Sequence, residues 1–422
     1  MSVPSSAPSS DPALAQPSAR VAQVFSAIGH LYIHLFTAIF ATIVLAIESD
    51  WHRPYQELLP LWTLGSLLVG AAAIPAGWLA DRWTARGMMA VFFFGIGAGS
   101  VLCGFATGPT TLMASLAVIG LFAAIYHPVG IPWVVRTARQ RGKALGLNGI
   151  FGNVGGGSAA LVAGILIDAA GWRAAFIVPG VVAIATGFVM VWYLLRGRVA
   201  EGDNDLSAPK SAGRGTLMRA FFVLSFVMFC TGLVYHTTQN AMPKLFELRL
   251  GSLFDGSIAG VGLMVFIVYT ISGVMQYVGG HIADRYPLKP VYVMCIMIQT
   301  PMLLLVAAAV GLPLLPAVML SIILSTAMLP AENLMLAHFA PAKHRSLSFG
   351  MKYVLSFGTA PLALQLIAWL SGETPFGGHD GFFTVFVALS GLMVLASIVV
   401  LALPSPQGRQ TNLPTPSPTP AE

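Results

Sequence analysis

Charged side chains are scarce in this sequence. Asp, Glu, Lys and Arg make up 9% of its 422 residues, whereas an average soluble domain contains about 25%. Hydrophobic residues make up 56%, so polar groups cannot cover most of the molecular surface. This composition excludes an ordinary soluble domain and indicates that lipid is the solvent of most of the chain.

Signals for disulfides, nucleotide binding and nucleic-acid binding are also missing. Cys103, Cys230 and Cys295 fall inside apolar runs without ligand or pairing spacing, so we expect buried small hydrophobic residues. No Gly-x-x-x-x-Gly-Lys-Ser/Thr segment is present, so no nucleotide-binding domain is expected. The net charge of +6 comes without a basic cluster that alternates with aromatics, so no nucleic-acid partner is expected.

Long apolar runs fill most of the remaining sequence. A helix that crosses a hydrocarbon layer about 30 Å thick needs roughly 20 apolar residues. Twelve runs meet this requirement, at residues 24–47, 58–80, 88–106, 112–135, 144–168, 172–195, 219–241, 257–282, 290–311, 313–338, 346–370 and 381–404. The sequence therefore predicts an all-α integral membrane protein with twelve transmembrane helices.

A polar segment divides these spans six and six. Residues 196–218 have the composition of a flexible cytoplasmic linker, between an N-terminal bundle at 24–195 and a C-terminal bundle at 219–404. Residues 1–23 and 405–422 are rich in Pro and Ser, and we expect disordered cytoplasmic tails there. The first of these tails lacks the apolar segment of a cleavable signal peptide.

Lys and Arg are unevenly distributed over the predicted loops. If both termini lie in the cytoplasm, eighteen of the 22 Lys and Arg residues, Lys352 among them, fall on that side. The four outside are Arg53, Arg173, Lys244 and Arg249. An excess of positive charge is typical of cytoplasmic loops. The distribution supports an even number of spans and predicts a multi-pass protein of the cell inner membrane with both termini in the cytoplasm.

One loop segment occurs twice, at the same place in each half. The copies are Gly77-Trp-Leu-Ala-Asp81-Arg82-Trp-Thr-Ala-Arg86, after the second span, and Gly280-His-Ile-Ala-Asp284-Arg285-Tyr-Pro-Leu-Lys289, after the eighth. Two halves of six spans with the same loop indicate parallel repeats related by an axis along the membrane normal.

This repeated pattern resembles the signature loop of the major facilitator superfamily, and the resemblance extends over about residues 24–404. It implies two pseudo-symmetric bundles that alternately expose a central cavity, with the loop residues acting as a conformational latch. Gly77 is expected to allow close helix approach, and Asp81 to lie beside the N-terminal dipole of the following helix and to pair with a cation. The segment from Asp168 to Phe176 also resembles this family and is expected to order a hairpin turn.

The chain departs from the family's drug–proton antiporters in two helices. The fourth span carries Tyr126-His127-Pro128 where those antiporters carry an intramembrane Arg, and the fifth is rich in Gly but lacks their Gly-Pro motif. Small residues in the fifth span would permit close, sliding helix contacts. These features loosely resemble exporters of the fosmidomycin-resistance type.

In the resembling family the first, fourth, seventh and tenth helices line the cavity, so polar residues there are candidates for substrate binding or coupling. They are His30, His34, Tyr126, His127, His236, Gln239, Asn240, Glu332, Asn333 and His338. Glu332 is the only acidic residue placed within a span, where it could exchange protons with the cavity or be a structural carboxyl satisfied by another helix. The i, i+4 spacing of His30 and His34 places them on one helix face. They could be ligands, proton carriers or helix-packing groups, and a His pair at this spacing is also a possible half of a metal site. We predict no complete metal site and no cofactor.

These observations predict a secondary active transporter that moves a small solute across the inner membrane by alternating access. Proton coupling, export and a monomeric state are the expected details, with the solute, protons and lipid as partners. An importer of a small metabolite or metal ion, and a non-transporting assembly or sensor protein, remain alternatives. No enzyme is expected, because the histidines lack the spacing of a nucleophile–base pair or a metal cluster.

Overall fold

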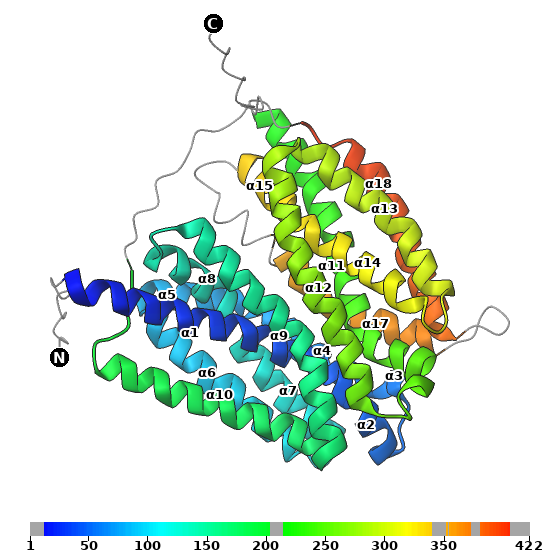
Figure 1. Ribbon diagram of the computed structural model, residues 1–422, viewed down its shortest axis with the longest axis horizontal. Helices are drawn as coiled ribbons and strands as arrows, with labels where there is room; N and C mark the ends of the chain where they lie inside the picture. The colour runs from blue at the N-terminus through cyan, green and yellow to red at the C-terminus, as the bar shows by residue number, and fades with distance from the viewer. Residues whose placement is uncertain (1–11, 203–213, 340–351, 353, 373–379, 406–422) are drawn as a thin grey trace, which may run out of the picture.

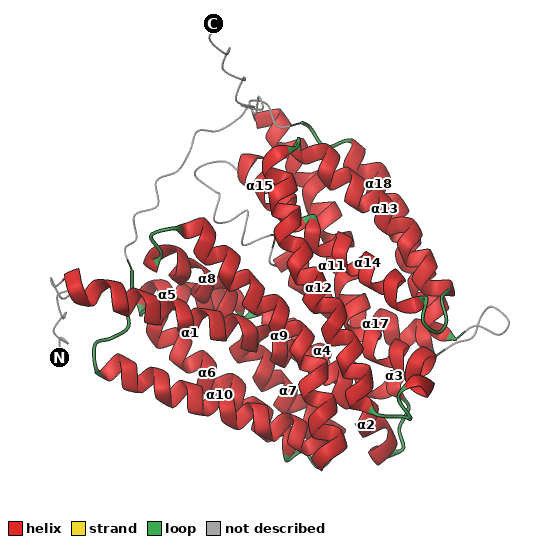
Figure 2. Ribbon diagram, viewed as in Figure 1, coloured by secondary structure: helices red, strands yellow, loops and turns green. Residues whose placement is uncertain are grey.

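The computed structural model describes residues 12–202, 214–339, 352, 354–372 and 380–405. Every regular element within these ranges is a helix (Figure 2). Within the described residues, twelve helical stretches are long and apolar enough to cross a membrane, and each overlaps one predicted span. The all-α membrane fold with twelve spans is thereby confirmed.

The two halves of the chain form two bundles. The first contains α1 (Pro12–Ala38), α2 (Phe40–Trp51), α3 (Tyr55–Leu58), η1 (Leu59–Trp62), α4 (Thr63–Ala71), α5 (Ala73–Arg82), α6 (Ala85–Gly104), α7 (Pro109–Ala123), α8 (Tyr126–Thr137), α9 (Arg141–Ala170) and α10 (Trp172–Leu195). The second contains α11 (Arg214–Leu250), η2 (Gly251–Leu253), α12 (Ile258–Arg285), α13 (Leu288–Ala308), α14 (Leu314–Ala327), α15 (Leu329–Phe339), α17 (Ala360–Ser371) and α18 (Gly381–Leu401).

The bundles lie side by side and meet mainly along α9 and α12 (Figure 1). They diverge toward α8 and α15, so the interface is tighter at one end than at the other. Because successive spans alternate in direction, the membrane protein has two faces. We call the one that carries Asp81 and Asp284 the Asp-Arg face, and the other, which carries Asp168 and Lys244, the Asp168 face.

Several helix bounds differ from the sequence-based prediction. The described part of the first-span helix starts at Pro12, so residues 12–23 of the segment expected to be a disordered tail are helical. In the same way, α11 is helical from Arg214, the first residue described after residue 202, so the last part of the predicted linker is helical. The seventh span continues to Leu253, well past its predicted end. Most of the predicted start of the eleventh span, residues 1–11 of the predicted N-terminal tail and nearly all of the predicted C-terminal tail lie outside the described residues.

Proline accounts for breaks within two spans. The fourth span is interrupted between α7 and α8, just before Pro128, and the tenth at Met328, just before Pro330. A proline has no N–H group for the carbonyl four residues earlier, and its ring crowds that carbonyl. In both spans the break in the helix therefore lies next to the candidate site residues in the sequence.

Glycine permits close contact at the junction of the bundles. A Cβ atom added to Gly155 in α9 would lie 2.2 Å from the carbonyl oxygen of Leu31 in α1. One added to Gly164 in α9 would lie 2.6 Å from the Cα atom of Ala259 in α12. Neither position can hold a larger residue without moving a helix, so the glycine-rich α9 sets the spacing both within its bundle and between the bundles.

The same helix approach recurs in both halves. A Cβ atom at Gly77 in α5 would lie 3.4 Å from the Cβ atom of Pro128 in α8, and one at Gly280 in α12 would lie 3.9 Å from the Cγ atom of Pro330 in α15. The first glycine of each repeated loop therefore packs a second-span helix against the proline of a fourth-span helix, as the internal repeat predicts.

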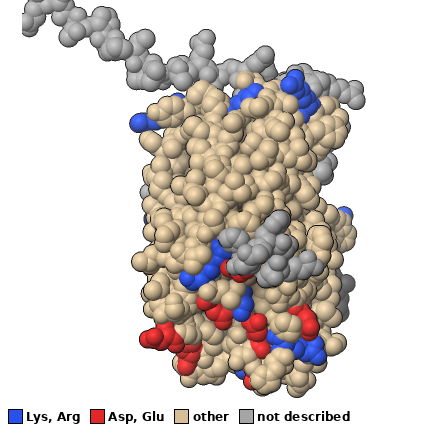
Figure 3. All heavy atoms as spheres, turned by 90° about the vertical axis from the view of Figure 1, so that its right-hand side faces the viewer, with Lys and Arg blue, Asp and Glu red and all other residues tan. Residues whose placement is uncertain are grey.

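The surface agrees with a membrane location. On the face shown in Figure 3, charged residues gather toward the two ends, and a broad band without charge lies between. Large apolar side chains such as Phe188, Tyr277, Trp369 and Ile398 are exposed along the spans. Such exposure is expected where the neighbour is hydrocarbon rather than water.

Candidate functional site

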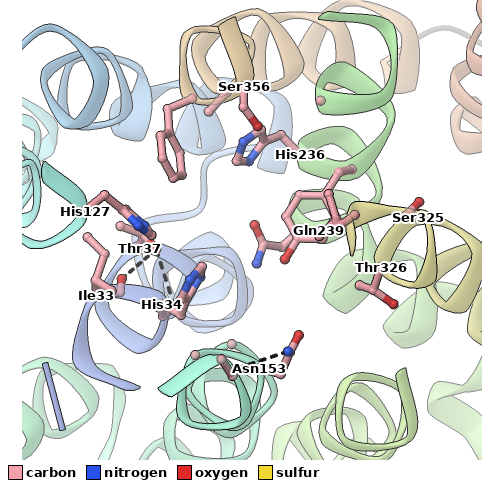
Figure 4. A pocket seen from close by; sticks show the side chains of 18 of the residues that line it. Ile33, His34, Thr37, His127, Asn153, His236, Gln239, Ser325, Thr326 and Ser356 are labelled. Atoms are coloured by element: carbon pink, nitrogen blue, oxygen red, sulfur yellow. Dashed lines mark hydrogen bonds between the residues drawn. The ribbon is translucent and has the colours of Figure 1, made fainter. Parts of the chain in front are cut away.

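A cavity of about 580 Å³ lies between the bundles (Figure 4). Helices α1, α4, α8 and α9 of the first bundle and α11, α12, α14, α15 and α17 of the second contribute to its wall. Most of the sequence-predicted candidates line it: His30, His34, His127, His236, Gln239, Asn240, Glu332 and Asn333. The break before Pro128 and the break before Pro330 lie beside the stretches of α8 and α15 that face the cavity.

Tyr126 and His338 do not line the cavity. Tyr126 is fully buried, and its hydroxyl donates to the carbonyl oxygen of Ser26 at 2.9 Å. Its ring stacks on that of His30, with centroids 5.0 Å apart and planes 18° apart, so Tyr126 positions a cavity histidine from behind. His338 is exposed in the last turn of α15 and packs on Phe339.

Three histidines form one wall of the cavity. The ring centroids of His30 and His34 are 5.0 Å apart, and the ring of His127 lies 5.7 Å from each. The i, i+4 spacing on α1 places the first two together, as predicted, whereas only the packing of α8 on α1 adds the third.

A backbone carbonyl orients the first of these rings. Nδ1 of His30 lies 2.8 Å from the carbonyl oxygen of Asn148 in α9. A carbonyl oxygen can only accept a hydrogen bond, so this Nδ1 carries the proton and Nε2 carries a lone pair. The side chain of Asn148 is held separately by the Tyr126 hydroxyl, at 3.0 Å from its Nδ2.

The opposite wall holds a buried ion pair. Nζ of Lys352 lies 2.8 Å from Oε1 of Glu332, and the side chains are 10% and 3% exposed. The hydroxyl of Tyr292 in α13 donates to Oε2 of Glu332 at 2.8 Å, and Lys352 also donates to the side-chain carbonyl of Asn333. Both charges are therefore compensated and hydrogen-bonded, which is the condition for burying them.

The position of Lys352 corrects the sequence-based charge assignment. Lys352 counts there as a cytoplasmic charge, yet the structure places it in the cavity wall. The uneven distribution of positive charge survives the loss of one residue. Residue 352 lies inside the predicted span 346–370. A lysine within a span needs an oppositely charged partner, as Glu332 does. The presence of one charge of each sign within the spans could therefore have predicted the pair from the sequence.

Amide side chains complete the cavity wall. Gln239 in α11 projects into the cavity (Figure 4). Asn240 instead bonds its own helix, its Nδ2 donating to the carbonyl of His236 at 2.8 Å. Asn153 in α9 donates to Oε1 of Gln276 in α12 at 2.6 Å, which links the bundles near mid-span. The sequence analysis missed Asn153 and Gln276 because the fifth and eighth spans were not among the expected lining helices.

Contacts between the bundles gather on the Asp168 face. Nζ of Lys244 in α11 lies 2.6 Å from Oε2 of Glu48 in α2. The hydroxyl of Tyr55 donates to the carbonyl oxygen of Asn240 at 3.1 Å. These contacts join the bundles between the cavity and that face.

Asp168 takes part in the same closure. Its carboxylate accepts from the Ser257 hydroxyl at 2.7 Å and from the backbone N–H of Ala259 at 3.0 Å. Both donors belong to the N-terminus of α12, whose unsatisfied N–H groups and dipole favour a carboxylate. The sequence predicts only a hairpin turn for the segment that begins at Asp168. The structure shows in addition that Asp168 connects the two bundles.

The repeated loops on the Asp-Arg face make fewer polar contacts than their sequence suggests. Arg82 lies over the Trp78 ring, 3.9 Å from its centroid, and Arg86 lies 3.5 Å from the Glu201 carboxylate. Glu201 also accepts from the backbone N–H of Ala85 at 2.6 Å. In this conformation the carboxylate at the N-terminus of α6 is therefore Glu201, not Asp81.

The second copy of the loop is mostly exposed. Asp284 and Arg285 have exposed side chains at the end of α12. Lys289 donates to the carbonyl of Leu401 at 3.1 Å, which ties the start of α13 to the end of α18. A latch role of the eight loop residues depends on a second conformation and stays a prediction.

The chain is similar in sequence to several bacterial proteins that are named for transport or for drug resistance. It is 26% identical to the niacin transporter of Acinetobacter baylyi over 246 residues, which are 57% of this chain and 54% of that protein. It is 34% identical to a puromycin resistance protein of Streptomyces alboniger over 255 residues, 51% of this chain and 48% of that protein. The chain thus spans about half the length of these relatives.

Solved structures share the fold over nearly the whole chain. A bacterial homologue of the human lysosomal transporter Spinster, in an inward-facing and unoccupied conformation, matches with a TM-score of 0.71 and 14% identity, over 92% of this chain and 97% of that one. A POT family transporter in complex with 5-aminolevulinic acid matches with a TM-score of 0.72 and 12% identity, over 90% and 95%.

The family comparison covers both bundles. The family model described as Major Facilitator Superfamily matches residues 26–254 and again residues 224–421. The two matches together reach all twelve spans, the first of them from residue 26 on, and each match contains one copy of the repeated loop. The resemblance seen in the loops therefore holds for the whole membrane domain, and the chain belongs to the Major Facilitator Superfamily.

Proposed function

We propose that this protein is a proton-coupled secondary transporter that exports a small organic solute through the cavity between its bundles. The observation that carries the proposal is the Glu332–Lys352 pair in the cavity wall. A carboxylate at this depth is stable either when paired or when protonated, and exchange between these two states is a way to move a proton.

The cavity suits a small organic molecule. Its volume of about 580 Å³ falls in the range of roughly 300–1,000 Å³ that is usual for small-molecule sites. Apolar residues such as Ile33, Val69 and Phe357 line it together with the histidines and amides. The mixture favours a solute with an apolar body and a few hydrogen-bonding groups.

The coupling cycle follows from the pair. When the cavity opens outward, a proton binds Glu332 and releases Lys352 from the ion pair. When it opens inward, the proton leaves to the cytoplasm, the pair re-forms, and solute enters the cavity for the next outward step. Solute and proton thus move in opposite directions through one site.

The orientation in the membrane is part of the proposal. Positive charge on the Asp-Arg face favours a cytoplasmic location for it, with both termini there and the protein in the cell inner membrane. The inter-bundle contacts on the Asp168 face then favour an inward-facing conformation for this structure. We further propose that one chain is sufficient, since each bundle contributes to a single cavity.

Export is proposed from the His-Pro segment of α8 and the glycine-rich α9, which resemble exporters, and from the relative named for puromycin resistance. Relatives named for niacin and riboflavin transport favour import as the second candidate. Puromycin, niacin and riboflavin are therefore suitable first probes.

Reconstituted vesicles test the proposal. The purified chain is placed in liposomes with a trapped pH-sensitive dye, and each probe is added with and without an imposed pH gradient. Export by exchange predicts proton movement opposite to solute movement, and import by co-transport predicts the same direction. If no member of a wider solute panel moves in either direction, a sensor or assembly role gains support instead.

A further inference from the structure

We propose that His30, His34 and His127 form a binding site for one divalent transition-metal ion in the cavity. This inference goes beyond proton-coupled solute export, and binding of the ion can be measured without any transport. The first two residues belong to α1 and the third to α8, so the packing of two helices completes the site.

The distances within the cluster fit a shared ion. One ring nitrogen from each histidine lies within 4.8 Å of those of the other two. When three imidazoles bind one tetrahedral ion at about 2.0 Å, their ring centroids lie roughly 5 Å apart. The observed centroid separations are 5.0, 5.7 and 5.7 Å, so small shifts of the rings would direct one nitrogen of each histidine at a shared ion.

The hydrogen bond of His30 matches a metal ligand. A metal-bound histidine usually donates its other ring N–H to a carboxylate or a backbone carbonyl, which fixes its tautomer. Nδ1 of His30 donates in this way to Asn148, at 2.8 Å, and leaves the lone pair on Nε2. The stacked Tyr126 ring holds the imidazole plane in place.

A glycine keeps space beside this nitrogen. A Cβ atom added to Gly152 in α9 would lie 2.7 Å from Nε2 of His30. Gly149, one turn earlier on the same helix, meets nothing within 4 Å when a Cβ atom is added. The small residue is therefore needed at the position next to the histidine, where a side chain would displace the ring.

The chemistry of the cluster selects the ion. Neutral imidazoles suit Zn²⁺, Cu²⁺, Ni²⁺ and Co²⁺, whereas Mg²⁺ and Ca²⁺ prefer oxygen ligands. Three protein ligands leave a fourth position open. All three rings line the cavity, so that position is available to water or to an anionic group of a solute.

Cobalt binding to the whole purified chain tests the site. The protein is prepared without a polyhistidine tag, reconstituted in lipid nanodiscs and titrated with Co²⁺, whose visible absorption reports tetrahedral coordination. We expect one ion per chain, displaced by Zn²⁺. His34→Asn and His127→Asn should each weaken binding at least about 100-fold. His281→Asn, an exposed histidine of α12, should leave binding unchanged.

Substitutions at Gly152 and Gly149 give a matched steric test in which all three histidine ligands are retained. Gly152→Ala should weaken Co²⁺ binding about tenfold by displacing His30, while Gly149→Ala should not. X-ray absorption of the Zn²⁺-loaded wild type should show three imidazole ligands at about 2.0 Å. Retention of binding in both histidine variants, or a Zn²⁺ shell without imidazoles, would overturn the proposal.

Discussion

Glu332 and Lys352 place two opposite charges where the membrane makes a single charge costly. Each has hydrogen-bond partners beyond the other, Tyr292 for the carboxylate and Asn333 for the ammonium group. Removing one member of a buried pair leaves the other uncompensated, at a cost of about 3–5 kcal/mol, whereas replacing both with apolar groups is often neutral. The pair can therefore be tested separately for stability and for coupling.

Stability is tested with a double-mutant cycle. Lys352→Met should lower the free energy of unfolding by about 3–5 kcal/mol, because Glu332 is left buried without its cation. The double variant Glu332→Gln, Lys352→Met should recover most of this loss. The measurement is thermal or denaturant unfolding in one detergent. Additive losses in the double variant would mean that the two charges do not stabilise each other.

Coupling is tested with Glu332→Gln. The amide resembles a permanently protonated acid, so we expect accumulation driven by a pH gradient to fall at least about tenfold, while movement of solute down its own gradient persists. Glu57→Gln is a matched control, since Glu57 is an exposed member of the Arg53–Glu57 pair. Equal loss of both transport modes would assign Glu332 to solute binding, and unchanged driven transport would remove it from the mechanism.

At the scale of helices, Arg249 joins three elements of the second bundle. Its guanidinium forms two hydrogen bonds to Asp380, each 2.7 Å long, at the N-terminus of α18. It also donates to the carbonyls of Val306, Ala307 and Ala309 at the C-terminus of α13, at 2.8 to 3.0 Å. One side chain from α11 thus satisfies groups at both helix ends.

The pH dependence of Asp380→Asn tests this junction. Burial raises the pKa of Asp380, but hydrogen bonds and charge from Arg249 outweigh it and hold that pKa below its ordinary value of 3.8. The stabilisation is therefore present above pH 3.8 and is lost as the pH falls through the lower, folded-state pKa. At pH 7 the variant should be about 1–3 kcal/mol less stable than wild type. That difference should shrink below pH 3.8, and a difference independent of pH would contradict an ionic contribution.

For the whole molecule, contacts on the Asp168 face bias the relative position of the bundles. The carboxylate of Asp168 binds the N-terminus of α12, and Lys244 binds Glu48. Each interaction joins the two bundles on this face, so we expect it to break when the face opens. Their loss should shift the population of conformations without unfolding either bundle, since each bundle has its own buried residues.

Asp168→Ala should therefore increase the population that is open on this face. Spin labels at Arg53 and Leu253, exposed residues of the two bundles on that face, should report more of the longer distance, by about fivefold or more in ratio. Asp255→Asn is a suitable control, because Asp255 is an exposed residue on the same face and Asn tolerates its left-handed backbone conformation, with φ 49°. An unchanged distance distribution would show that Asp168 does not hold the face closed.

Asp81→Asn tests the latch on the other face. We expect strongly reduced solute transport with normal membrane insertion, because the loop charge acts in a conformation closed on the Asp-Arg face. Glu201→Gln is the informative companion, since Glu201 binds the start of α6 in the present conformation. Wild-type turnover in Asp81→Asn would remove the latch role.

The sequence by itself determined the number and approximate position of the spans, the division into halves and the repeated loop. These properties depend on local composition, because the thickness of the membrane fixes the length of an apolar run. The same reasoning identified Glu332, since one acidic residue within an apolar run is visible without any structure. The shared helix face of His30 and His34 also follows from spacing alone.

The tertiary structure decided which distant residues meet. Lys352 became the partner of Glu332, His127 joined the two histidines of α1, and Asp168 reached the N-terminus of the opposite bundle's α12. These contacts join helices far apart in sequence, and helical periodicity places a residue on a face without stating what that face packs against. Only the packing of one helix on another supplies the partner, and with it the chemistry of the cavity.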